Sequence, residues 1–301
     1  MTLVDPPTRV VWAVDVLASI VSVARVIENA DGTPVDRPRI SAVEPPPPVV
    51  QHCPRTTWER ASDVADKVFD MVTMGGTVKP TLVVMSKQVW GALNPPPRIA
   101  KDRAERMAEK TAEQTKLRRQ GKFDEAKAVR MRRGSSVQTD PTAQRRLQVH
   151  AMIEDRLHRA GIPVAEFPFP TALSWLRDGE VAKKGDDEKV SPMAALDAAV
   201  AARWGIVPPP MKIPTTELVN GKKQPGKVIE RDSTFRPGVA ALAAVGAMSV
   251  GIETDVPVTE TRLRIARAEH NRAAQFPSNR LCPLGLDSWL ELNRRPEMLT
   301  V

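Results

Sequence analysis

Short runs of β-branched and small apolar residues open the chain and predict a β-hairpin. Between Val10 and Ala24, Asp15 is the only charged residue. Such runs, bounded by turn residues, are typical of strands that are buried on both faces. We therefore expect a first strand that ends near Asp15, a tight turn, and a second strand from about Ile20. Arg37 to Val43 then predicts a third, antiparallel strand at the edge of the sheet, because Pro38 lacks the N–H that an inner strand must donate.

The next part of the chain alternates between helical and strand patterns. Thr56 and Glu59 form a capping box, and the apolar residues that follow recur at helical spacing. Thr81 to Met85 predicts a fourth strand. Asp140 and Pro141 favour the start of a long helix that Gly161 ends, and Ile162 to Phe167 predicts a fifth strand.

Helical patterns dominate the last third of the sequence. We expect a short helix over Pro170 to Leu176, a helix from Pro192 to Trp204, and a buried Ala-rich helix from Pro237 to about Val250. The segment from Pro208 to Pro225 is rich in Pro and Lys, which predicts a partly ordered excursion, that is, a connecting segment outside the regular helices and strands. Thr259 to Ala274 predicts a basic helix.

The order of these elements predicts an α/β fold with a mixed five-stranded sheet and helices on both faces. We expect a core over residues 1–256, interrupted at 95–139 by a charged helical insertion that breaks at Gly121. Residues 257–301 would then form a basic helix and a tail that docks on the core through Trp289 and Leu290.

Charge favours an anionic partner. The formal net charge is +8 and the isoelectric point is about 9.7, so nucleic acid is the first candidate. The chain contains no Tyr and few other aromatic residues, which argues against a protein that binds RNA or single strands by stacking. Cys53 and Cys282 stand far apart and indicate reduced thiols rather than a disulfide framework or a zinc site.

The sequence shows no secretory signal and no apolar run of the roughly 18 residues that span a bilayer. We therefore expect a cytoplasmic, intracellular protein with no membrane partner.

Asp15 is the candidate for chemistry. Carboxylates are rarely buried without a partner, so two interpretations stand. In the first, backbone amides of the turn satisfy a structural Asp15. In the second, Asp15 is a metal-binding, catalytic carboxylate on the first strand of a nuclease fold.

The order of elements resembles the ribonuclease H-like fold, and the details resemble its RuvC-like Holliday junction resolvases, especially those of phages. The stretches that carry this resemblance are AVDVLASIVSVARV, TLVVMSKQVWG, DPTAQRRLQVHAMIEDRLHRAGIPVAEFPFPTALSWLRDG, SPMAALDAAVAARWG and PGVAALAAVGAMSVG. The resemblance implies a homodimer that cuts four-way DNA junctions with two divalent ions, Mg²⁺ or Mn²⁺, which about four carboxylates hold.

The sequence departs from the family pattern at most of these carboxylates. Asp15 fills the first position, but Ser86 and Lys87 stand where the family has Glu at the end of the fourth strand. Phe235 and Gly238 stand at the two acidic positions of the last core helix. One carboxylate cannot hold two hydrated magnesium ions, and a lysine repels them. The acids of nearby polar loops that could substitute are Asp186, Asp187, Glu188 and Asp232.

The resemblance also implies where DNA binds. We expect basic residues from three places on the phosphate backbone. They are Arg145 and Arg146 on the helix after Asp140, Lys183, Lys184 and Lys189 in the loop before the helix from Pro192, and Arg132 and Arg133 in a basic hinge at the end of the charged insertion. The alternative for each of them is ordinary surface charge.

Three hypotheses remain open at this level. The first is a RuvC-like protein that binds branched or duplex DNA with a degenerate acidic centre, a pseudoenzyme. The second is a structural or interaction protein on the same fold, with a replication or virion partner. The third is an active divalent-metal-dependent endodeoxyribonuclease that uses relocated acids.

Overall fold

The structure is a computed structural model of the chain. It describes residues 8–17, 20–44, 49–50, 53–54, 56–87, 97–128, 141–180, 192–209, 211–219, 222–231, 235–267 and 282–293. The chain divides into a larger unit, Met1–Lys87 with Val149–Val301, and a smaller unit, Gln88–Gln148.

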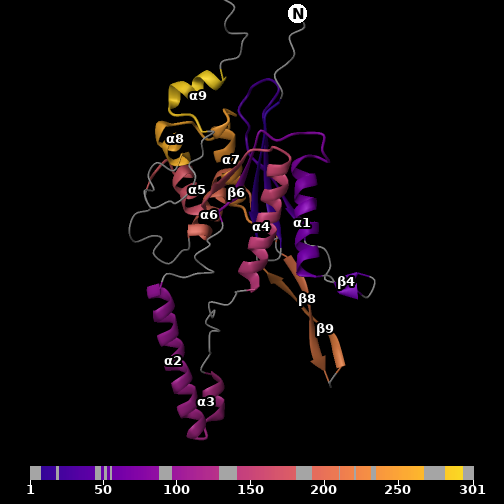
Figure 1. The fold of residues 1–301 in the computed structure, drawn as a ribbon, viewed down its shortest axis with the longest axis vertical. Coiled ribbons are helices and arrows are strands. Elements are labelled where there is room, and N and C mark those ends of the chain that lie inside the picture. The colour runs from indigo at the N-terminus through magenta and orange to yellow at the C-terminus, as the bar shows by residue number, and fades with distance from the viewer. Residues whose placement is uncertain are drawn as a thin grey trace, which may run out of the picture. The chain divides into compact units, whose positions relative to one another are not determined.

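A mixed five-stranded sheet forms the centre of the larger unit (Figure 1). Its strands lie in the order β3-β2-β1-β6-β7. The first three strands pair antiparallel, whereas β1 pairs parallel with β6 and β6 pairs parallel with β7. The strands span Val10–Val16 (β1), Val21–Ile27 (β2), Arg39–Val43 (β3), Leu82–Ser86 (β6) and Val164–Phe167 (β7). This order and these directions are those of the ribonuclease H-like fold, so the predicted fold class is confirmed.

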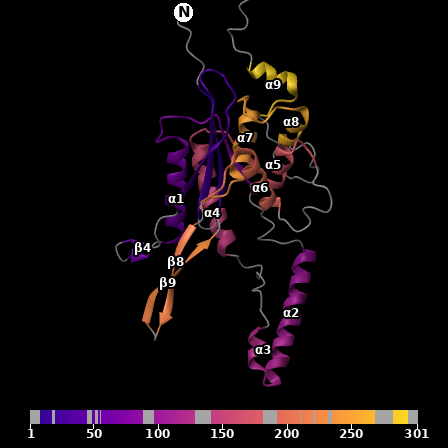
Figure 2. The ribbon, with the colours of Figure 1, turned by 180° about the vertical axis from the view of Figure 1, so that it is seen from behind.

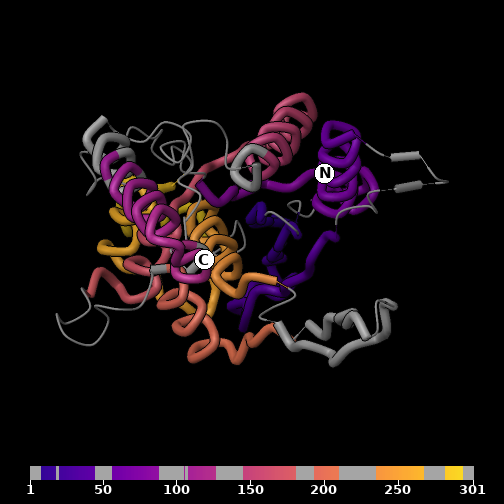
Figure 3. Tube along the Cα trace, turned by 90° about the horizontal axis from the view of Figure 1, so that it is seen from below, coloured from indigo at the N-terminus to yellow at the C-terminus, as the bar shows by residue number. Residues whose placement is uncertain are grey.

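Alternate residues of each inner strand point to opposite faces of the sheet, and each face has its own hydrophobic core. On β1, Trp12 and Val14 pack with α1 (Thr57–Val72) and α4 (Pro141–Arg159). Val11 and Ala13 pack instead with α5 (Phe169–Leu176), α6 (Pro192–Trp204) and α7 (Val239–Ser249). Figures 2 and 3 show these two helix layers on either side of the strands. Asp15 continues the second series and so belongs to the face that α7 covers.

α7 is the most deeply buried helix that the structure describes, and each of its residues is buried. The helix approaches the sheet closely at Gly246. A Cβ atom added there would lie 2.6 Å from Val84 Cγ2 and 2.8 Å from Val11 Cγ1. Because real Cβ atoms keep larger distances, glycine at position 246 sets how closely α7 packs on β1 and β6.

α8 (Glu260–Ala266) and α9 (Leu286–Asn293) complete this layer. Arg262 is 8% exposed and donates hydrogen bonds to the carbonyls of Trp175 and Pro257, at 3.1 and 2.8 Å. Trp289 is buried and donates to the Met248 carbonyl at 2.8 Å, as the predicted docking requires. Leu290, however, is 48% exposed and does not share that burial.

Two parts of the predicted secondary structure need correction. The predicted excursion over residues 208–225 contains a strand of a hairpin, β8 (Met211–Val219) and β9 (Lys222–Arg231), with a register shift between Pro214 and Thr216. The predicted helix from Thr259 ends at Ala266, and residues 268–281 lie outside the described part. The short strands β4 (Val49–Val50) and β5 (Cys53–Pro54) pair with each other.

The smaller unit contains a helical hairpin made of α2 (Pro97–Arg119) and α3 (Phe123–Ala128), together with the first residues of α4. Gly121 connects the helices with a φ of 76°, a conformation that glycine adopts without strain. Gln114 Nε2 donates to the Ala126 carbonyl at 3.0 Å and so joins the two helices. The predicted break at Gly121 is confirmed. Across the described ranges, no helix is long and apolar enough to cross a membrane.

Candidate functional site

A cluster of polar side chains lies where the parallel strands of the sheet end. Carboxyl ends of parallel strands meet at one edge, where open α/β sheets usually bind ligands. The side chains of this cluster, which we call the polar centre, are Asp15, Ser86, Lys87, His150, Glu166, Asp197 and Arg236.

Asp15 lies at the middle of the polar centre and is 2% exposed. The Ser86 hydroxyl, from the end of β6, donates to Asp15 Oδ1 at 2.5 Å. Arg236 Nη1 lies 3.1 Å from Asp15 Oδ2 and forms an ion pair with it. Side chains from two distant elements therefore hold this carboxylate, and one of them carries a full positive charge.

Two further contacts hold Arg236 in place. Its backbone N–H donates to Ser22 Oγ at 2.9 Å, and Ser22 is the residue opposite Asp15 in the β1–β2 register. Its guanidinium lies 5.3 Å from the centre of the Phe169 ring, within the range of a cation–π contact. Pro237, which follows directly, is buried at the approach to α7. The guanidinium is thus held over Asp15 rather than free to leave it.

Asp197, on α6, belongs to the same charge cluster. Its Oδ1 accepts a hydrogen bond from the backbone N–H of Gly238 at 2.8 Å. Burial raises the pKa of the Asp197 carboxyl, and the nearby negative charge of Asp15 adds to this, while the Gly238 bond and Arg236 oppose it. Arg236 therefore interacts with two carboxylates, Asp15 and Asp197.

Lys87, His150 and Glu166 form the other half of the polar centre. Lys87 Nζ lies 3.9 Å from Glu166 Oε2, and the lysine side chain is only 8% exposed. Burial lowers the pKa of Lys87, and the charge of Glu166 opposes this shift. Each basic side chain described in the centre thus has an acidic neighbour.

His150 is buried on α4, with Nε2 3.4 Å from Glu166 Oε1. Burial lowers its pKa below the usual value of 6.5, although Glu166, Glu154, the Ser86 backbone and Asp15 oppose the shift. The imidazole is therefore neutral at neutral pH. His158, on the same helix, is exposed instead.

The described residues do not fit the pair of magnesium ions that the family resemblance implies. Mg²⁺ requires hard oxygen ligands in an octahedron, and a cationic guanidinium already lies 3.1 Å from one Asp15 oxygen. The other Asp15 oxygen accepts the Ser86 hydroxyl. Within the described ranges, no three His, Cys, Asp or Glu side chains come together as a group that could hold a metal ion. Asp186, Asp187, Glu188 and Asp232 lie outside the described residues.

The predicted DNA contacts are only partly described. Arg145 is exposed and Arg146 is partly buried, both near the start of α4 in the smaller unit. The residues that lie outside the described part are Arg132, Arg133, Lys183, Lys184 and Lys189.

Sequence reasoning missed Arg236, His150, Glu166 and Asp197. A signal existed for His150, because it lies three and seven positions before Ile153 and Leu157, on the buried stripe of its helix. Arg236 lies between Phe235 and Gly238, the two positions where the family pattern has acids. No local pattern marks it, because its partners come from β1 and β2.

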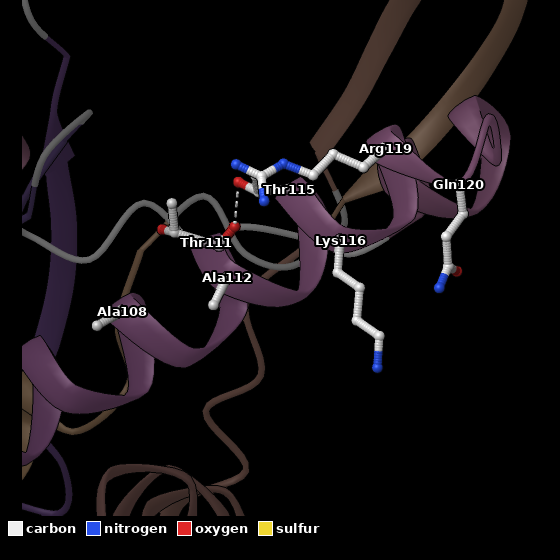
Figure 4. Close-up of a pocket in the computed structure, with 7 residues that line it drawn as sticks. All are labelled: Ala108, Thr111, Ala112, Thr115, Lys116, Arg119 and Gln120. Carbon is white, nitrogen blue, oxygen red and sulfur yellow. Dashed lines mark hydrogen bonds between the residues drawn. The ribbon is translucent and has the colours of Figure 1, made fainter.

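An open pocket of about 720 Å³ lies along α2 in the smaller unit (Figure 4). Its lining residues come from this helix and from Gln120, which follows it. Thr115 Oγ1 donates to the Thr111 carbonyl at 2.8 Å. Lys116 and Arg119 are its charged members, and no acid or histidine lines it. The pocket therefore offers positive charge but no metal ligands or proton-transfer groups.

Comparisons with known proteins match the structure of this chain but not its sequence. No protein-family model matches the chain, and no curated protein matches its sequence. The structure is similar to that of RuvC from Thermus thermophilus, with a TM-score of 0.40 and 11% identity over 81% of this chain and 98% of that one. It is also similar to T. thermophilus RuvC in complex with a Holliday junction substrate, with a TM-score of 0.37 and 11% identity over 78% and 92% of the two chains.

Proposed function

We propose that this chain is a DNA-binding protein on a ribonuclease H-like fold and that its polar centre does not carry out metal-dependent cleavage. The observation that carries the proposal is the ion pair between Asp15 and Arg236 at 3.1 Å. In this pair, Arg236 supplies the positive charge beside Asp15. In a nuclease of this fold, metal ions supply that charge.

The charges of the polar centre support a non-nucleolytic role. Asp15 pairs with Arg236, and Glu166 lies beside Lys87 and the neutral His150. Metal-assisted phosphodiester hydrolysis needs an ion that lowers the pKa of bound water and stabilises the leaving oxygen. A guanidinium binds phosphate by hydrogen bonds but has no site for a bound water to ionise. The centre is therefore suited to structural support or to phosphate contact.

The charge of the whole chain supports DNA as the partner. The net charge is +8, and α2 alone contains eight basic and four acidic residues. Lys116, Arg118 and Arg119 gather in its last turn, and Lys122 follows directly; all four are exposed. Such side chains bind phosphates and release counterions, which provides affinity without reading sequence.

The test measures DNA binding and cleavage with the full chain. A four-way junction and a linear duplex with the same arms are titrated by fluorescence anisotropy at several salt concentrations. We expect affinity to fall steeply as salt rises, with a slope near −0.9 for each phosphate contacted. In parallel, both substrates are incubated with Mg²⁺ and with Mn²⁺, and we expect no nicking.

Two results would contradict this proposal. Absence of salt-dependent binding to either DNA would remove the DNA-binding role and favour a protein-interaction role. Nicking that requires Mg²⁺ or Mn²⁺ and disappears in Asp15→Asn would show an active metal nuclease. A preference for the junction over the duplex would further identify branched DNA as the target.

A further inference from the structure

We infer that the Arg236 guanidinium takes the place of a divalent metal ion in the polar centre. Removing this guanidinium would turn the polar centre into a binding site for a divalent cation. This inference rests on the proposed non-nucleolytic function and names the residue responsible for it.

Arg236 is preorganised for this role. Its backbone is hydrogen-bonded to Ser22 at 2.9 Å, and its guanidinium stacks against Phe169 at 5.3 Å. The side chain is 20% exposed and the Asp15 side chain 2%, so the pair is largely removed from water. An arginine held on both its backbone and its guanidinium loses little further entropy when it pairs with a carboxylate.

Two carboxylates share this cation. Asp15 contacts Arg236 directly at 3.1 Å. Asp197 is anchored by the Gly238 N–H, two positions beyond Arg236, and its charge responds to both Arg236 and Asp15. Asp15 is buried and Asp197 is partly buried. Carboxylates near each other repel, and a nearby cation reduces that repulsion. One guanidinium thus compensates the negative charge of both carboxylates. In other oxygen-rich sites, a metal ion does this.

The groups left after removal of the guanidinium are oxygen donors. These donors are the two Asp15 oxygens, the Ser86 hydroxyl, which lies 2.5 Å from Asp15, and the Asp197 carboxylate, which interacts electrostatically with Asp15. Carboxylates and hydroxyls of this kind suit Mg²⁺ and Mn²⁺. Mn²⁺ is the better probe, because it binds such sites more tightly and can be observed by electron paramagnetic resonance.

The experiment compares thermal unfolding with and without millimolar Mn²⁺ for four proteins: wild type, Arg236→Ala, the double variant Asp15→Asn with Arg236→Ala, and Arg203→Ala. Arg203 is the matched control, because it also pairs with an aspartate, Asp255, at 2.9 Å, but away from the polar centre. We expect the Tm of Arg236→Ala to fall by about 10 °C, since an uncompensated buried carboxylate remains.

Mn²⁺ should restore about half of that loss in Arg236→Ala. It should leave the Tm of wild type, the double variant and Arg203→Ala unchanged. Electron paramagnetic resonance should show bound Mn²⁺ in Arg236→Ala and free Mn²⁺ in the other three proteins. If Arg236→Ala does not fold without metal, Arg236→Met keeps the contact with Phe169 and replaces it in the same comparison.

Two outcomes would overturn the inference. One is a rise in the Tm of wild type with Mn²⁺ that is absent when Asp15 is replaced by Asn. This would mean that a metal binds in the polar centre while Arg236 is present. The other is an Arg236→Ala or Arg236→Met protein that folds but binds no Mn²⁺. DNA binding is measured separately on the same proteins, so a wild type that fails to bind DNA removes the proposed function without deciding the cation result.

Discussion

Asp15 is an example of a buried charge whose energetic role depends on its partner. Removing one member of a buried ion pair leaves the other without compensation, which costs about 3 to 5 kcal/mol for full burial. Arg236 keeps 20% of its side chain exposed, so the cost here is smaller. We expect Asp15→Asn to lower the free energy of unfolding by about 2 kcal/mol in urea titrations.

Asp66→Asn is the matched control for this prediction. Asp66 also pairs with an arginine, Arg156 at 2.6 Å, but its side chain is 58% exposed. Exposed pairs contribute roughly 0 to 1 kcal/mol, so this variant should change stability little. Equal losses in the two variants would contradict a special role for the Asp15 pair.

His150 predicts a pH dependence of stability. Its pKa is lowered in the folded protein, so the unfolded chain binds a proton more readily than the native one. The stability that neutral His150 contributes is therefore present above pH about 6.5 and is lost as pH falls through its folded pKa. The charged groups that face it are Glu166 on β7, Glu154 on its own helix and Asp15 on β1.

The measurement is urea unfolding of wild type and His150→Gln between pH 5 and 8. Wild type should lose stability toward acid, and the loss should be smaller in His150→Gln because glutamine does not titrate. The His158→Gln variant is the control, since His158 is exposed. A pH profile that is the same in all three proteins would contradict the assignment.

At the scale of elements, α7 depends on one glycine for its close approach to the sheet. Gly246→Ala adds a methyl group that meets Val84 and Val11. Overpacking of this kind costs about 1 to 3 kcal/mol, and the better helix propensity of alanine offsets up to about 1 kcal/mol of it. We therefore expect a net loss of stability and a lower Tm in calorimetry. A more stable Gly246→Ala protein would show that α7 can move away from β1 without cost.

We predict that the basic residues at the end of α2 contribute to DNA binding. Arg118 and Arg119 are exposed in its last turn, and replacing both with Ala should weaken binding to any DNA sequence. The salt slope should decrease in magnitude by about 1 to 2, because up to two phosphate contacts are lost. Glu109→Gln with Glu113→Gln, exposed on the same helix, is the control and should bind as tightly as wild type or more tightly. An unchanged salt slope in the arginine variant would place the DNA contacts elsewhere.

Hydrophobic patterning predicted the elements of the larger unit well, because burial leaves a periodic signature. The strands of the central sheet and the capped helix after Thr56 follow from local spacing and capping alone. The hairpin β8–β9 was missed because Pro214 and Pro225 interrupt its strands, and proline usually argues against a strand.

The polar centre was only partly predictable for a different reason. Asp15 is conspicuous in sequence as a single charge within an apolar run. Its partners Ser86 and Arg236 become neighbours only when β6 and the start of α7 pack around β1. Charge compensation across a fold has no periodicity, so a linear pattern does not reveal it.

At the scale of the whole molecule, the sheet needs the late part of the sequence for its stability. Residues 235–267 include α7, which covers the face of β1 and β6 that Val11 and Val84 form. We expect a chain that ends at residue 234 to expose this apolar face, to bind a hydrophobic dye, and to show no cooperative thermal transition. A truncated chain with a sharp transition near that of the full chain would contradict this dependence.

The contact between Ser22 and Arg236 spans 214 positions, so it also sets a time interval during synthesis. At ribosomal speeds of about 5 to 20 residues per second, the opening hairpin waits on the order of 10 to 40 s for the arginine that neutralises it. During that wait, its valine-rich edges are open to pairing with other nascent chains. Chaperone supply and growth temperature should therefore determine the yield of this protein more than the stability of its finished fold.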